Sequence, residues 1–248
     1  MRVLSKIEIK NNYVVKGINL EGIRKIGNPE NIAIDYYNQG IDEIIFSDVV
    51  ASLYQRNNLY NLIDQFSKNI FVPMTLGGGL KNINDINQAL KSGADKVFFN
   101  SSVLKNPELI KEFSDFFGSQ CIVISIEAKK LNNKYLCFYN SGRENSNKEV
   151  SNWIQECESL GCGEFLITSI DKDGTRNGFD LELLDLSLKF ASRPVIISGG
   201  GATQEHVEEL IKNYKPSGIC FSSCLHYELM KIGNIKKILK SKNINYVR

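Results

Sequence analysis

The chain has 248 residues, of which 42% are hydrophobic and 23% charged, which is typical of a folded chain rather than a disordered one. Thirty Lys and Arg stand against 28 Asp and Glu, a net charge of +2 with no long block of one sign. This balance argues against binding nucleic acid through its phosphates. The first ten residues lack an apolar signal segment, and no stretch approaches the roughly 18 apolar residues of a membrane span, so we expect a cytoplasmic protein.

The cysteines and histidines do not form a metal-binding pattern. The six cysteines contain no Cys-x-x-Cys pair, and the chain has two histidines, so the usual ligand spacing of a zinc site is missing. Reduced, buried thiols are the simpler interpretation. We therefore expect neither a metal nor a cofactor.

Eight short runs rich in Val, Ile and Phe are each followed by turn residues, as expected for strands. The predicted strands are residues 3–9, 43–48, 72–76, 96–99, 121–126, 165–169, 195–198 and 218–221. Amphipathic helical patterns lie between them, at 31–38, 84–92, 149–160 and 205–213, and a closing helix is predicted at 229–239. Eight strand and helix units at this length favour a single (β/α)₈ barrel over residues 1–248 rather than an open doubly wound sheet.

The chain also repeats itself. A glycine triplet at 77–79 is followed by Asn100-Ser101, and a second triplet at 199–201 is followed by Ser222-Ser223. The spacing from Gly78 to Asn100 equals that from Gly200 to Ser222. Residues 7–10 have a counterpart in 126–129. We therefore predict two half-barrels related by twofold pseudo-symmetry, although similar glycine-rich turns could also arise by chance.

Both triplets and both polar clusters follow predicted strands, and the carboxyl ends of the strands carry the chemistry of a barrel. Glycine lets backbone N–H groups approach an anion closely, and helix N-termini favour it. Two such cradles on one barrel mouth predict a ligand with a phosphate at each end, although plain turns are the alternative. The residues predicted to bind phosphate are Gly78, Gly79, Asn100, Ser101, Gly199, Gly200, Ser222 and Ser223.

Glu8 and Glu127 end the first and fifth predicted strands, which lie opposite each other in an eight-stranded barrel. A carboxyl group in a partly dry barrel mouth can have a pKa near neutrality, as general acid and base catalysis requires. The alternative is simple pairing with a nearby cation such as Lys16, Lys10 or Lys129.

Other polar residues at the predicted mouth are weaker candidates. Asp48 ends the second strand, and Asp171 and Asp173 follow the sixth, where turn formation is an equally good explanation. Residues 134–139 and the turn 140–142 predict a small hairpin that could cover a substrate. His226 follows the last strand and is expected to form part of the site wall.

The chain resembles the cyclase subunit of imidazole glycerol phosphate synthase over essentially its whole length. The motifs are Val14-Val15-Lys16-Gly17, Leu76-Gly77-Gly78-Gly79, Gly93-Ala94-Asp95-Lys96-Val97, Phe117-Gly118-Ser119-Gln120, the run Thr168-Ser169-Ile170-Asp171-Lys172-Asp173-Gly174-Thr175, and Ser198-Gly199-Gly200-Gly201. The resemblance implies a (β/α)₈ barrel that takes ammonia from a glutaminase subunit. It implies a substrate that is a bis-phosphorylated ribulosyl aminoimidazole carboxamide nucleotide, converted to imidazole glycerol phosphate and an aminoimidazole carboxamide ribonucleotide.

The resemblance also assigns roles to individual positions. The family's catalytic aspartates correspond to Glu8 and Glu127, each one methylene longer, and a family cysteine corresponds to Lys6. It implies that Glu127 is the general acid and Glu8 the general base, with the loop at 10–27 closing over substrate. Further substrate contacts are implied for Lys16, Asp48, Thr168, Asp173 and Gly174.

An ammonia gate is implied at the opposite end of the barrel. Its four charges correspond to Arg2, Glu43, Lys96 and Glu164, two cations and two anions that begin predicted strands. Paired signs would reduce the cost of burying them. Asp95 and Gln120 match positions near the face where the glutaminase docks.

Three other functions remain open at this stage. The two Asp to Glu departures favour a cyclase-like subunit that channels ammonia to a sugar amidotransferase system in surface-polysaccharide biosynthesis. A related sugar-phosphate isomerase would share the two phosphate sites but would not need the gate. A non-catalytic barrel that only activates a partner would not turn over substrate with free ammonium.

Overall fold

Eight parallel strands form a closed barrel in the computed structural model, which describes residues 1–51 and 59–245. In barrel order the strands are β1 (Arg2–Lys10), β4 (Glu43–Asp48), β5 (Met74–Gly77), β6 (Lys96–Phe99), β7 (Ile122–Leu131), β10 (Glu164–Ser169), β11 (Val195–Ser198) and β12 (Gly218–Phe221). The circle closes where β12 pairs with β1, Arg2 lying opposite Gly218. The predicted (β/α)₈ barrel is confirmed, and β1 and β7 lie four strands apart by either route around it.

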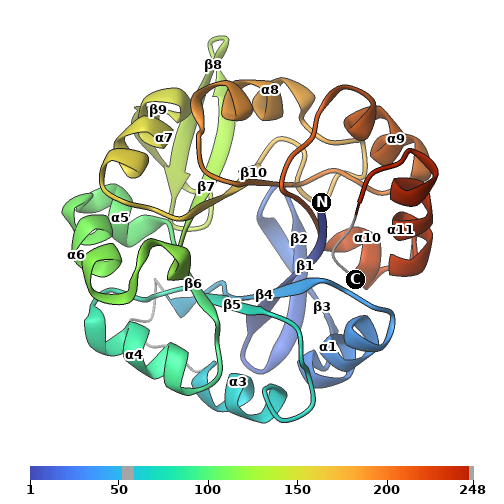
Figure 1. The fold of residues 1–248 in the computed structure, drawn as a ribbon, viewed down its shortest axis with the longest axis horizontal. Helices are drawn as coiled ribbons and strands as arrows, with labels where there is room; N and C mark the ends of the chain where they lie inside the picture. Colours follow the sequence, from blue (N-terminus) through green and yellow to red (C-terminus); the bar gives the residue numbers. More distant parts are fainter. Residues whose placement is uncertain (52–58, 246–248) are drawn as a thin grey trace.

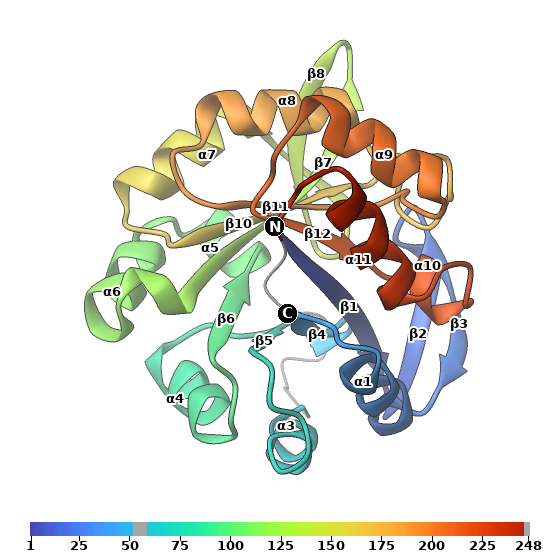
Figure 2. The ribbon, with the colours of Figure 1, turned by 45° about the vertical axis from the view of Figure 1, so that its right-hand side comes forward.

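Helices surround the strands (Figures 1 and 2). They are α1 (Pro29–Asn38), α3 (Tyr60–Phe66), α4 (Ile83–Lys91), α5 (Ser101–Lys105), α6 (Glu108–Phe117), α7 (Val150–Ser159), α8 (Leu181–Phe190), α9 (Gln204–Asn213), α10 (Ser223–His226) and α11 (Ile232–Ser241), with a 3₁₀ turn at Ser119–Cys121. Several start where the sequence supplies a cap: the side chains of Asn28 and Thr203 accept hydrogen bonds from first-turn N–H groups. No helix in the described part of the chain is long and apolar enough to span a membrane.

Two antiparallel hairpins extend the barrel at its carboxyl end. β1 continues into β2 (Tyr13–Ile18) and β3 (Glu21–Gly27), and β7 continues into β8 (Lys134–Tyr139) and β9 (Glu144–Glu149). In each hairpin the first turn is an Asn-Asn pair in which both residues have positive φ. The φ values are 49° and 65° at residues 11–12, and 49° and 62° at residues 132–133. Asn tolerates this geometry, which suits two-residue hairpin turns. The predicted second hairpin is confirmed, whereas the predicted loop at 10–27 is largely β-structure.

The barrel interior is layered because every second residue of a strand points inward. Along β1, Arg2 is followed inward by Leu4, Lys6 and Glu8, and along β10 Glu164 is followed by Leu166 and Thr168. The apolar layer is a cluster separate from the main core and comprises Leu4, Ile45, Phe98, Val123, Leu166, Ile196 and Cys220. It lies between charged side chains at the amino end of the barrel and polar ones at the carboxyl end.

Candidate active site

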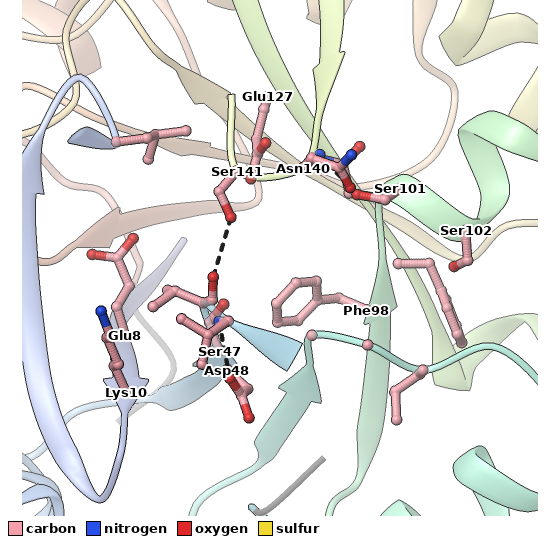
Figure 3. A pocket seen from close by; sticks show the side chains of 18 of the residues that line it. Glu8, Lys10, Ser47, Asp48, Phe98, Ser101, Ser102, Glu127, Asn140 and Ser141 are labelled. Carbon is pink, nitrogen blue, oxygen red and sulfur yellow. Dashed lines mark hydrogen bonds between the residues drawn. The ribbon is translucent and has the colours of Figure 1, made fainter. Parts of the chain in front are cut away.

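A cavity of about 640 Å³ occupies the carboxyl end of the barrel (Figure 3). Glu8 and Glu127 face it from different sides, as expected for side chains on opposite strands. The predicted site residues that line it are Glu8, Lys16, Asp48, Gly78, Gly79, Asn100, Ser101 and Glu127. The structure therefore brings together both glutamates and the first of the two predicted cradles.

Glu8 is buried between two lysines. Its Oε2 accepts a hydrogen bond of 2.7 Å from Lys16 Nζ, and its Oε1 lies 3.6 Å from Lys6 Nζ. Burial alone would raise the pKa of Glu8, but the two ammonium groups outweigh burial and hold the pKa below its usual value. Burial likewise opposes the charge of Lys16, but Glu8 and Asp173 raise the pKa of that ammonium. Glu8 is thus a stable carboxylate at neutral pH.

Glu127 has the opposite surroundings. Its Oε2 accepts one hydrogen bond, 2.8 Å from the backbone N–H of Gly142 in the turn between β8 and β9, and no lysine of the described chain forms an ion pair with it. Burial raises its pKa to about 7, and the cation of Lys6 only partly opposes this. The proposed pairing with lysine therefore applies to Glu8 and not to Glu127. A pair of carboxyl groups with separated pKa values can act as base and acid.

The first cradle is open to the cavity. Gly78 and Gly79 have φ values of +99° and +74°, and a Cβ on Gly78 would lie 2.3 Å from the carbonyl oxygen of Asp48, so glycine is needed here. The side-chain oxygen of Asn100 is buried without a hydrogen-bond partner among the described residues. The cationic side chains of Lys10, Lys81, Lys105 and Arg143 also line the cavity. The combination suits an anionic group.

The second cradle has the same backbone geometry but does not line this cavity. Gly199 and Gly200 have φ values of +103° and +91°. A Cβ on Gly200 would lie 2.0 Å from the carbonyl oxygen of Gly178, whose N–H donates back to Gly200. Within the described chain, Thr168, Asp173, Gly174, Gly199, Gly200, Ser222 and Ser223 do not line the cavity.

The hairpin formed by β2 and β3 contacts the loop after β10, which lies beside Gly199 of the second cradle. The N–H of Asn19 donates to the Asp173 carbonyl oxygen at 2.8 Å, and its side chain donates to the Ile170 carbonyl oxygen at 2.7 Å. Lys16 Nζ binds both carboxylate oxygens of Asp173, at 2.9 and 2.8 Å. The hairpin thus lies on the loop after β10, and Lys16 joins Glu8 to Asp173 beneath it.

His226 forms hydrogen bonds with two hydroxyl groups beside the second cradle, those of Tyr36 and Ser222. Its Nδ1 lies 2.7 Å from the Tyr36 hydroxyl and its Nε2 3.1 Å from Ser222 Oγ. Burial lowers the pKa of His226 to about 4, so the ring is neutral and fixes Ser222 rather than carrying charge. Thr168 Oγ1 is buried and has no partner in the described part of the chain.

The four charges predicted as a gate form a closed ring at the other end of the barrel. Arg2 binds Glu43 at 2.6 Å and also Glu164, and Lys96 binds Glu164 at 2.9 Å and Glu43 at 3.2 Å. Thr75 donates a further hydrogen bond to Glu43. The ring alternates in sign, which compensates the burial of both carboxylates. Asp95 and Gln120 are exposed near the starts of β6 and β7, at the same end of the barrel, where Asp95 also accepts from the N–H of Met74.

Sequence reasoning missed several residues of the cavity. Lys6 was noted as a departure but not as a site residue, although its two-residue spacing from Glu8 places it on the same inner face of β1. The turn 140–142, in contrast, was predicted to cover a substrate, and its Asn140 and Ser141 do line the cavity, where Ser141 Oγ donates to the Val49 carbonyl oxygen at 3.4 Å (Figure 3). No group of three or more His, Cys, Asp or Glu within residues 1–51 and 59–245 could hold a metal ion.

Comparison with known proteins gives one family. Residues 2–231 match the family model described as "Histidine biosynthesis protein". The chain is 42% identical to the imidazole glycerol phosphate synthase subunit HisF of Hydrogenobaculum sp. (strain Y04AAS1), over 98% of this chain and 97% of that relative. It is 46% identical to a subunit of the same name from Legionella pneumophila, over 81% and 95%, and 37% identical to that of Streptococcus mutans, over 98% and 97%.

Proposed function

This chain belongs to the histidine biosynthesis protein family, as a HisF-type cyclase subunit of an imidazole glycerol phosphate synthase, and from that premise we propose its reaction. Ammonia adds to the bis-phosphorylated ribulosyl aminoimidazole carboxamide nucleotide. Ring closure and cleavage then yield imidazole glycerol phosphate and the aminoimidazole carboxamide ribonucleotide. The observation that carries the proposal is the opposition of Glu8 and Glu127 across one cavity that also contains an anion cradle.

The two glutamates divide the proton transfers. Glu127, with a pKa of about 7, is protonated often enough at neutral pH to donate a proton to the substrate oxygen. Glu8, held as a carboxylate by Lys16, accepts a proton from the attacking nitrogen. Lys16 and Asp173 hold Glu8 in position, which matters because a displacement of about 1 Å can cost 10²-fold in rate.

One phosphate of the substrate binds at Gly78, Gly79, Asn100 and Ser101. The other binds at Gly174, Gly199, Gly200 and Ser222, after the β2–β3 hairpin moves away from the loop that follows β10. Thr168, whose hydroxyl has no partner among the described residues, then contacts the substrate between the two ends. This placement makes hairpin movement part of substrate binding.

Ammonia enters from a glutaminase subunit docked at the amino end of the barrel. Neutral ammonia would pass the ring of Arg2, Glu43, Lys96 and Glu164 and then the apolar layer around Leu4 and Phe98. An apolar layer favours neutral ammonia over the ammonium ion, because burying an unpaired charge is costly. Asp95 and Gln120 lie at the docking face.

A second candidate keeps the ammonia path but changes the acceptor. In this alternative the chain is a cyclase-like, ammonia-channelling subunit of a sugar amidotransferase system. The glutamates in place of aspartates, and a cavity that is open to one cradle only, favour it.

Turnover of the bis-phosphorylated nucleotide with saturating ammonium salt tests the proposal. The HisF reaction predicts formation of imidazole glycerol phosphate without any glutaminase. The second candidate replaces the first if two results are found together. The chain forms no product across pH 6–9, whether or not it binds the nucleotide, and it still stimulates glutamine hydrolysis by a partner.

A further inference from the structure

Lys6 is a buried cation at the centre of the barrel that the proposed acid and base roles do not use. It precedes Glu8 by two residues on β1, and only 5% of it is exposed. It lines the same cavity as Glu8 and Glu127. Burying an ammonium group is costly unless its charge is compensated. Glu8, 3.6 Å away, compensates the charge of Lys6, so the open question is what its N–H groups bind.

The donors of Lys6 are uncommitted, in contrast to those of its neighbour Lys16. Lys6 Nζ lies 3.6 Å from Glu8 Oε1, too far for a good hydrogen bond. Within the described chain no hydrogen bond from this ammonium group is found, whereas Lys16 donates to Glu8 and twice to Asp173. Lys6 thus faces the cavity with N–H groups that a bound molecule can accept.

We propose that Lys6 is a third catalytic residue, whose ammonium binds the oxygen of the carbon that ammonia attacks. The proposal rests on the proposed function, in which that carbon is a ketone carbon. The ammonia lone pair forms the new C–N bond, and the C=O π electrons move onto the oxygen beside Lys6. Glu127 gives its proton to that oxygen, and Glu8 takes one from the nitrogen. The product of the step is a carbinolamine.

The local charge balance supports this role. Two carboxyl groups, Glu8 and Asp173, share the single ammonium of Lys16, and burial together with the neighbouring Glu8 raises the pKa of Asp173. When both are ionised, this cluster carries one excess negative charge. An oxygen that becomes anionic during the attack would be repelled by this excess. The cation of Lys6 cancels it, and fixed donors in a site with little water stabilise such an oxygen strongly. The acceptor of this cavity is therefore a ketone or aldehyde whose carbonyl lies between the glutamates.

The test compares Lys6→Met, which keeps the length of the side chain, with Lys6→Arg, which keeps the charge. With saturating ammonium salt and the nucleotide, Lys6→Met should lower kcat by about 100-fold, as loss of an oxyanion donor does, and leave KM within about threefold. Lys6→Arg should restore part of the rate. Lys129→Met, on the strand that mirrors β1 and outside the cavity lining, is the matched control with wild-type kcat.

The pH profile separates a catalytic role from a structural one. Removing the Lys6 cation should raise the pKa of Glu8 and of Glu127, so the limb on which activity falls with rising pH, set by Glu127, should move to higher pH. The assignment is overturned if Lys6→Met is folded, as judged by circular dichroism, keeps kcat within threefold of the wild-type value, and loses activity with rising pH over the same range as the wild-type protein. Such a result leaves the proposed function intact if the wild-type protein is active.

A binding measurement tests Lys6 if the wild-type protein fails to turn over the nucleotide. Dihydroxyacetone phosphate and glycerol 3-phosphate differ in having a carbonyl or a hydroxyl group beside one phosphate. In calorimetry the wild-type protein should bind dihydroxyacetone phosphate about fivefold more tightly than glycerol 3-phosphate, because one additional hydrogen bond changes the dissociation constant by about that factor. Lys6→Met should bind the two equally. Equal preference in both proteins overturns the role of Lys6, whatever the reaction.

Discussion

Glu8 and Glu127 show that the surroundings of a carboxyl group in the barrel decide whether its ionised or its protonated form is favoured. Both are glutamates at matching points of the two half-barrels, but Glu8 contacts two ammonium groups and Glu127 a single backbone N–H. The cations favour the ionised form of Glu8, whereas burial favours the protonated form of Glu127. The symmetry of the fold therefore supplies opposed carboxyl groups, and the unequal lysines make their chemistry different.

Replacing Glu127 with Gln should remove the general acid without removing the substrate site. We expect nucleotide turnover to fall by about 10³-fold, within the range for loss of a general acid, while nucleotide affinity stays within about threefold. In the wild-type protein the reactive form of Glu127 is protonated, so turnover should fall as the pH rises through about 7. Steady-state kinetics and calorimetry measure the two quantities. Wild-type rates for Glu127→Gln would remove this residue from the mechanism.

At the scale of elements, the local patterns of the sequence predicted the strands well. The two Gly-Gly-Gly triplets and the pairs Asn100-Ser101 and Ser222-Ser223 placed the ends of β5, β6, β11 and β12, because a buried strand followed by turn residues is a local pattern. The hairpin at 134–139 was recognised, but the one formed by β2 and β3 was expected as a loop. β3 is mostly exposed, so it lacks the apolar alternation that identifies a strand.

Long-range contacts could not be predicted in this way. The contact of the β2–β3 hairpin with the loop at 170–174 is made by Asn19 and Lys16, which lie more than 150 residues away in the sequence. Neither local propensity nor spacing encodes such a contact. Lys6 could have been found, because a lysine inside a predicted barrel strand breaks the apolar pattern and marks a functional position.

Gly174→Ala tests how the β2–β3 hairpin is held. A Cβ at this position would lie 2.3 Å from the carbonyl oxygen of Gly17, and the φ of +72° also disfavours alanine. The hairpin should therefore be displaced, and its amide hydrogens in β2 should exchange about tenfold faster. Gly233→Ala is the control, because a Cβ there would meet no atom within 4 Å. Unchanged exchange in Gly174→Ala would show that the hairpin is held by its side chains alone.

At the scale of the whole molecule, the barrel separates two polar ends by an apolar layer. The ring of Arg2, Glu43, Lys96 and Glu164 closes the amino end, and the cavity with Glu8 and Glu127 occupies the carboxyl end. Because the interior alternates with a period of two along each strand, charges at the start of a strand share its inner face with the carboxyl group near its end. β1 thus contributes both to the ring, through Arg2, and to the cavity, through Glu8.

Arg2→Ala tests whether the ring controls the passage of ammonia. The substitution breaks the ring at two ion pairs, after which Glu43 and Glu164 keep their ion pairs with Lys96. In the complex with its glutaminase, we expect product formed per glutamine hydrolysed to fall by about half or more, whereas kcat with saturating ammonium salt should stay within about twofold. The physical reason is that free ammonium salt supplies ammonia at the carboxyl end, without passing the ring. Arg193→Ala, an exposed cation that precedes β11 at the same end of the barrel, should leave both quantities unchanged. An equal loss with glutamine and with ammonium would mean that Arg2 stabilises the barrel and does not act as a gate.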